Sequence, residues 1–316
     1  MGPDRRRLAA RAFVAALTAA CGGALALAVG VSEPAPTPAV LPPSAPSAPS
    51  APSAPSAAPS AAPSAAAQRR GGGFGGRVPL ATPESFDGAF HFCRLAFRAS
   101  RAGDGGNWGV DFPRADINVS IRLSELTRTV VGFDASREPQ HLVVRPTDPE
   151  LFQCPFVMAT EVGSAYFDEE ESARLRDYLL KGGFLWVDDF WGSYAWDFWH
   201  AQLQRILPPS EYDVVDLPPG HPLFHTQFQV EAVPQIPSIN YWAGSGGDTS
   251  ERGRDSATAH ARAVLDGHGR IMVLMTHNTD IGDSWEREGD SPDYFYTFSV
   301  RGYAFGVNAI LYALTH

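Results

Sequence analysis

The chain has 316 residues, a formal net charge of −10 at pH 7 and three cysteines. Residues 1–77 carry seven arginines and two acids, which leaves a net charge of −15 on the remainder. Because a domain this acidic repels phosphate groups, we expect no nucleic-acid partner and no binding to an anionic lipid surface. Three cysteines are also too few for a disulfide-stabilised scaffold.

The first 31 residues predict an export signal. Arginines stand at positions 5, 6, 7 and 11, and residues 12–31 contain no charged side chain. A basic start followed by an apolar run is typical of a secretory signal peptide. The run also has the roughly 20 residues that span a bilayer, so a single membrane anchor is the alternative. Either way we expect an exported protein, periplasmic or extracytoplasmic, which is held at the membrane if this segment stays uncleaved.

Residues 32–83 predict a disordered linker rich in Pro, Ala, Ser and Gly, which includes the near-repeat SAPSAPSAPSAP. Such a segment buries too little apolar surface to offset the entropy lost on ordering, so it forms an extended tether. The folded domain is therefore expected over residues 84–316.

Strands and helices alternate along this domain. In chain order we expect a strand at 90–97, a helix at 116–130, strands at 140–146 and 151–160, a helix at 167–183, a strand at 184–189, a helix at 193–207, strands at 212–218, 261–266 and 270–278, and a closing helix at 292–316. This alternation is typical of an α/β fold with a mainly parallel sheet.

Local patterns predict where several elements begin. Asp168 and Glu171 match a reciprocal capping box at the start of a helix. Asp116 and Ser193 are expected to cap the helices that they precede. Residues 184–187 are apolar on both faces, as in a central strand covered by helices on either side.

Cys93 and Cys154 are the two cysteines of the predicted domain. In an exported protein they could form a disulfide. Both lie in apolar surroundings, FHFCRLAF and LFQCPFV, so we expect buried free thiols. Neither has the spacing of a metal-binding motif.

Two adjacent carboxylates, Asp188 and Asp189, follow the predicted strand FLWV. Ligands of open α/β sheets bind beyond the carboxyl ends of the strands, so both are candidate catalytic residues. Successive side chains of a regular strand point to opposite faces, so only one of the two can face a cleft. The alternative is that both cap the following helix or accept backbone hydrogen bonds in the turn.

A second polar cluster, THNTDIGDSWE, follows the strand IMVLM in what we expect to be a loop. It offers His277 as a further catalytic candidate, and as ligand-binding candidates Asn278, Asp280, Asp283 and Glu286. Carboxylates suit a divalent metal, whose ligands here would be His277, Asp280 and Asp283. The alternative that we favour is a hydrogen-bonded loop, so no cofactor is predicted.

A third cluster, NWGVDFPRAD, adds Trp108 and Asp111 as ligand-binding candidates. The chain contains no P-loop, no GxSxG and no HExxH motif. The turn after FLWV offers Asp188, Asp189 and Phe190, which include neither a thiol nor a hydroxyl. This argues against acyl transfer through a nucleophile at that turn.

Six motifs occur in a specific order: FCRLAF, NWGVDFPRADIN, LRDYLLKGGFLWVDDFWG, HPLF, MTHNTDIGDSWE and GVNAILYALTH. Together they resemble a bacterial domain-of-unknown-function family, number four-one-five-nine, over about residues 84–316. The resemblance implies a class I glutamine amidotransferase-like fold, a flavodoxin-like three-layer sandwich. GGFLWV is similar to the strand that leads to the amidotransferase cysteine. Because Asp188 or Asp189 stands at that position, no glutaminase activity is expected.

These observations favour a non-catalytic module of the cell envelope that binds a glycan ligand or an envelope protein at the strand ends. The alternative is a hydrolase of a carbohydrate or cell-envelope substrate, with Asp188 or Asp189 as base and His277 as acid or metal ligand. In that case Trp108 would stack on a sugar ring. A hydrolase of this kind needs these acids close to His277 and Asp280 in one pocket.

Overall fold

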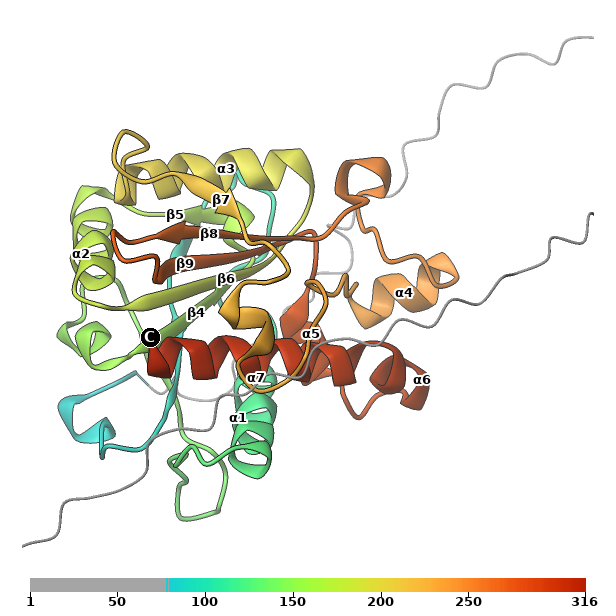
Figure 1. Cartoon of the computed structure of the whole chain (residues 1–316), viewed down its shortest axis with the longest axis horizontal. Helices are drawn as coiled ribbons and strands as arrows, with labels where there is room; N and C mark the ends of the chain where they lie inside the picture. Colours follow the sequence, from blue (N-terminus) through green and yellow to red (C-terminus); the bar gives the residue numbers. More distant parts are fainter. Residues whose placement is uncertain (1–77, 79) are drawn as a thin grey trace, which may run out of the picture. The chain divides into compact units, whose positions relative to one another are not determined.

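The computed structural model of the chain describes residues 78 and 80–316 (Figure 1). The predicted export signal and most of the predicted linker, residues 1–77 and 79, lie outside the described residues. Within the described part, no helix has both the length and the apolar character needed to cross a membrane.

A seven-stranded sheet forms the centre of the domain, in the order β3-β1-β4-β6-β9-β8-β7. The strands β3, β1, β4, β6 and β9 run parallel, and β8 pairs antiparallel with both β9 and β7. The strands are β1 Phe92–Leu95, β3 His141–Val144, β4 Phe156–Thr160, β6 Phe184–Phe190, β7 Val214–Asp216, β8 His260–Leu265 and β9 Ile271–His277. A separate ribbon pairs β2 Arg98–Ala99 with β5 Ala165–Tyr166. The predicted strands and the mainly parallel sheet are confirmed.

Helices cover both faces of the sheet, which makes the domain a three-layer α/β sandwich (Figure 1). One face carries α2 Glu169–Leu180 and α3 Gly192–Ile206, and the other carries α1 Arg114–Leu126, α5 Ile281–Glu286 and α7 Val300–Thr315. The short helices α4 Ile239–Ser245 and α6 Pro292–Tyr294 complete the set, and a π-helical turn at Phe295–Ser299 joins α6 to α7. This architecture is compatible with a flavodoxin-like sandwich.

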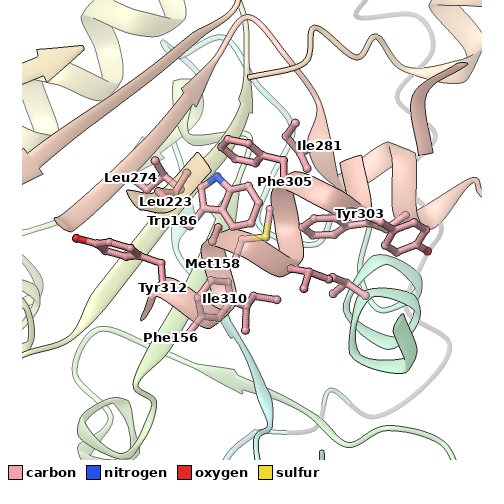
Figure 2. Close-up of a cluster of buried hydrophobic side chains, with 14 of the residues drawn as sticks. Phe156, Met158, Trp186, Leu223, Leu274, Ile281, Tyr303, Phe305, Ile310 and Tyr312 are labelled. Atoms are coloured by element: carbon pink, nitrogen blue, oxygen red, sulfur yellow. The ribbon is translucent and has the colours of Figure 1, made fainter. Parts of the chain in front are cut away.

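The apolar core beneath α7 is centred on Trp186 of β6 (Figure 2). The Trp186 ring meets Trp285 and Phe305 edge-on at 5.6 and 5.7 Å, and its Nε1 donates to Thr276 Oγ1 at 2.7 Å. Leu185, the neighbour of Trp186 in β6, lies in the opposite core, under α2 and α3. β6 is thus buried on both faces, as its sequence predicts, and truncating Trp186 to alanine would cost about 3–5 kcal/mol.

Two of the three predicted helix caps are wrong. Asp168 and Glu171 form the expected capping box of α2. Asp116 instead lies inside α1, whose N-cap residue is Pro113. Ser193 lies inside α3, and its backbone N–H donates to the Asp255 carboxylate at 2.8 Å. A carboxylate 62 residues along the chain therefore supplies the acceptor that a local cap would have offered.

Cys93 and Cys154 form a disulfide, so the expectation of free thiols is wrong. The bond joins β1 to the segment that enters β4, two neighbouring strands of the sheet, across 61 residues of chain. The apolar surroundings indicated burial correctly, but the adjacency of these strands is a tertiary feature. In the chain-entropy description, closing a loop of this length stabilises the fold by about 4 kcal/mol.

Candidate functional site

The acidic pair Asp188 and Asp189 and the polar segment THNTDIGDSWE, both predicted at strand ends, lie next to each other in the structure. β6 and β9 are adjacent and parallel, and Phe190 of β6 pairs with His277 of β9. The segment predicted as a loop after β9 contains the helix α5, which lies at one end of the sheet (Figure 1). The register shifts between Val187 and Phe190, and Asp189 has a left-handed φ of 55°. Because β6 is irregular here, the alternation expected for Asp188 and Asp189 does not apply, and both are buried.

Asp188 connects three elements at this end of the sheet. Its Oδ1 accepts from Thr276 Oγ1 at 2.5 Å, and its Oδ2 accepts from the Gly282 backbone N–H at 2.9 Å. Burial raises the pKa of Asp188 to about 7, against the opposing effect of these hydrogen bonds. Both carboxyl oxygens are engaged, so the residue holds β6, β9 and α5 together.

Asp111, Asp189 and Asp280 form one buried acidic group. One carboxylate oxygen from each lies within 4.8 Å of the other two. Burial raises the pKa of all three well above its usual range. Neighbouring carboxylates add to the shift, Glu161 and Asp111 for Asp189, and Asp189 and Asp111 for Asp280. We call this set the inner trio.

Asp111 has an open acceptor. The residue is only 6% exposed, and its Oδ2 has no hydrogen-bond partner among the described residues. Its backbone is left-handed, with φ of 64°, and its carbonyl accepts the Ala115 N–H of α1 at 2.9 Å. A Cβ atom on Gly282 would stand 2.6 Å from Oδ2. The missing side chain at Gly282 therefore makes room for this carboxylate.

Asp111 also belongs to a second acidic group with Asp283 and Glu286 of α5, again within 4.8 Å. We call this set the outer trio. Asp283 Oδ2 accepts from the Ile239 N–H at 2.7 Å and from the Tyr294 hydroxyl at 3.0 Å. Burial raises the pKa of Asp283 to about 7, partly opposed by the Ile239 hydrogen bond. Asp283 is buried and Glu286 half-buried.

A pocket of about 330 Å³ borders the outer trio, and Glu286 is part of its wall. The other wall residues are Arg114, Asn118, Arg287, Glu288, Gly289 and Asp290. Arg287 Nε lies 2.7 Å from a Glu286 carboxylate oxygen and 3.6 Å from Asp283 Oδ1. Arg287 thus offsets part of the negative charge on the side of the outer trio that faces the pocket.

Arg94 is a fully buried cation that interacts electrostatically with Asp111, and sequence reasoning missed it. Its guanidinium pairs with Asp116 and donates to Thr160 Oγ1 at 3.1 Å. Thr160 in turn donates to the Val110 carbonyl at 3.2 Å, next to Asp111. Arg94 lowers the pKa of Asp111, but less than burial and the neighbouring carboxylates raise it. The available signal was a lone arginine inside the apolar run FCRLAF.

Glu161, which follows β4, was also missed. It has a left-handed φ of 57° and raises the pKa of Asp189 through its charge. The signal that could have found it is its position directly after an apolar strand next to β6.

His277 lies apart from both acidic trios. The neighbouring Thr276 side chain reaches Asp188, so His277 points to the opposite face of the sheet. Its Nε2 donates to the Gly192 carbonyl at 3.0 Å, and its Nδ1 accepts from Arg262 at 3.2 Å. Burial lowers the pKa of His277 to about 4, so the ring is neutral at pH 7. The structure does not bring His277 together with Asp280 as catalytic or metal partners.

Asn278 and Trp108, two further ligand-binding candidates, both make contacts within the fold. Asn278 accepts from the Gly192 N–H and donates to the Thr258 carbonyl, both at 2.8 Å, so its amide joins the β9 loop to α3. Trp108 is half-buried and meets Phe112 edge-on at 5.5 Å.

Residues 91–314 match a family model described as "Domain of unknown function (DUF4159)". The matched range includes the whole sheet and every residue of both acidic trios. No curated protein matches the chain.

Proposed function

The chain belongs to the DUF4159 family of domains of unknown function, and from its acidic site we propose that it is a binding module for a hard divalent cation. Asp111, Asp189 and Asp280 hold this cation through carboxylate oxygens. Mg²⁺, Mn²⁺ and Ca²⁺ are the cations that prefer such ligands.

The open Oδ2 of Asp111 carries the proposal. A buried acceptor without a partner costs about 1–3 kcal/mol. Here an oxygen of the same carboxylate lies within 4.8 Å of oxygens of two further buried carboxylates, whose mutual repulsion adds to the cost. One cation supplies a partner for the open oxygen and cancels the repulsion. The left-handed backbone at Asp111 and Asp189 is the kind of local strain that accompanies binding sites.

We also propose that the domain has a class I glutamine amidotransferase-like fold. A sharp turn with positive φ at Asp189 leads from β6 to α3, which begins at Gly192. Such a strand-to-helix turn presents the nucleophile in α/β-hydrolase enzymes. In this chain the turn presents the carboxylate of Asp189. A carboxylate at this position supports cation binding and argues against glutaminase activity.

The proposal also includes export, with an envelope protein or a glycan as the partner of the tethered domain. The Cys93–Cys154 disulfide supports export, because such bonds persist in oxidising compartments. The apolar segment 12–31 supports it independently.

Cation titration of the full chain tests the proposal. After treatment with chelator, the protein is titrated with Mg²⁺, Mn²⁺ or Ca²⁺ while its thermal unfolding is followed. At 100 times the dissociation constant, a bound cation stabilises the folded state by about 3 kcal/mol. We expect Asp189→Asn and Asp280→Asn to abolish this shift, and the exposed control Asp177→Asn to retain it. No shift with any of the three cations, up to millimolar concentration, would overturn the proposal.

Metal-assisted hydrolysis is the second candidate function. The pocket of about 330 Å³ beside Glu286 favours it, because a substrate could reach the acidic site there. A glycan panel in the same unfolding assay tests this candidate. A glycan that stabilises the protein only when the cation is present is the expected result.

A further inference from the structure

We infer that the acidic site holds two divalent cations and that Asp111 bridges them. The inference rests on the proposed function, which assigns one cation to the inner trio. The second cation binds to the outer trio, between Asp111, Asp283 and Glu286.

The shared residue is the geometric basis of this inference. Asp111 is the one residue common to both trios of the described chain. Within residues 78 and 80–316 its Oδ2 has no hydrogen-bond partner, so this oxygen is available to a cation. A carboxylate at the junction of two ligand sets is suited to bridging, because paired metals in two-metal sites lie about 3.5–4 Å apart.

The charge of the site also favours two cations. The two trios together contain five carboxylates. When all five carboxylates are ionised, as metal binding requires, a single divalent cation leaves three negative charges to Arg94 and Arg287, and Arg94 already pairs with Asp116. Two divalent cations balance all but one of the five carboxylates, and Arg287, beside Glu286, offsets the last. Buried charges of one sign need such a balance.

The two positions differ in their access to solvent. Every residue of the inner trio is buried. The outer trio has one half-buried member, Glu286, which lines the pocket of about 330 Å³. We therefore expect the inner cation to exchange slowly. The outer cation exchanges faster and keeps coordination positions open to an oxygen ligand entering through the pocket.

Mn²⁺ binding to the full chain tests the inference through both stoichiometry and magnetic coupling. We expect two Mn²⁺ per chain by calorimetry and an exchange-coupled electron paramagnetic resonance signal. Glu286→Gln should reduce the stoichiometry to one and leave the signal of an isolated ion. Asp283→Asn, the second variant of the outer trio, should do the same. Glu288→Gln alters the same pocket wall outside both trios, so it should keep two coupled ions.

The alternative outcomes separate the inference from the proposed function. One Mn²⁺ per wild-type chain, lost in Asp189→Asn and retained in Glu286→Gln, would overturn the second cation and leave the first in place. Two Mn²⁺ without magnetic coupling would overturn the bridging role of Asp111. No bound Mn²⁺ in the wild-type chain would overturn the proposed function together with the inference.

Discussion

The acidic trios lie on one side of the ends of β6 and β9, and the surroundings of His277 lie on the other. The polar groups of these two regions differ in one respect. Both ring nitrogens of His277 have partners, Gly192 and Arg262. Asp111 keeps an oxygen that has no partner in the described part of the chain. Both regions are buried and both have shifted pKa values. Burial and a perturbed pKa alone therefore do not identify a site, whereas an open acceptor among like charges does.

Asp111→Asn tests the acidic side of this comparison and should have the largest effect. Asparagine keeps the shape of the side chain and tolerates a positive φ, so the fold is expected to persist. The variant should lose at least about 100-fold in cation affinity, measured by calorimetry. Without cation it should be about 1 kcal/mol more stable than the wild type, because one buried charge is removed.

The two readouts of Asp111→Asn must change in opposite directions to support the comparison. A purely structural role for Asp111 would lower the free energy of unfolding and leave the affinity unchanged. The exposed variant Asp177→Asn, on α2, should change neither quantity.

Acidification tests the His277 side of the comparison. The folded-state pKa of about 4 lies below the usual histidine value of 6.5, so the unfolded chain takes up the proton first as the pH falls. This contribution to stability is present above pH 6.5 and is lost as the pH falls towards 4. Between pH 6.5 and pH 4.5 the loss is about 2 kcal/mol. Buried carboxylates with raised pKa values, such as Asp188 and Asp283, change the stability in the opposite direction over the same pH range, so urea unfolding must measure this loss against a variant that lacks the imidazole.

The His277→Gln variant provides the reference for this pH dependence. It should be less stable than the wild type at pH 6.5, and the difference should shrink by about 2 kcal/mol at pH 4.5. Carboxylates titrate alike in both proteins and cancel in the comparison. A difference that is independent of pH would show that His277 is protonated in the folded state or exposed to solvent.

Gly282→Ala should have a smaller effect on the acidic side. The added Cβ would stand 2.6 Å from Asp111 Oδ2, so the carboxylate must shift away from its position in both trios. We expect cation affinity to fall by about 10-fold, because a ligand is displaced without being removed. Gly289→Ala is the matched control, since a Cβ there meets no atom of the described residues within 4 Å. Equal affinities for the two variants would argue against the position assigned to Asp111.

His277→Gln should have the smallest effect on cation binding, a change within about 2-fold, because His277 belongs to neither trio. Calorimetry at pH 7.5 measures this directly. A large loss of affinity would mean that the two sides of the strand ends are energetically coupled.

The sheet could be predicted from sequence because its signals are local. The apolar run of β6 and the capping box of α2 each occupy a few consecutive residues. The acids at the end of β6 and after β9 were also predictable, since the carboxyl ends of neighbouring parallel strands meet at one edge. The helix α5 was missed because its six residues, IGDSWE, are too few for a periodic pattern.

The remaining features depend on residues that are distant in sequence. Asp111 meets Asp189 and Asp280 only through tertiary packing. The cap of α3 comes from Asp255, and the disulfide joins Cys93 to Cys154. Which partner each polar group finds is decided by packing, so the open oxygen of Asp111 had no sequence signal.

The inner trio is assembled from three segments that are far apart in the chain, the turn before α1, the end of β6 and the start of α5. Its ligands come together only after the strands between them have taken their places, so loop closure across most of the domain must precede cation capture. We therefore expect the cation to slow unfolding while leaving the refolding rate nearly unchanged. Occupancy of the site then reports on the completion of folding, and the cation lengthens the lifetime of the native state without guiding its formation.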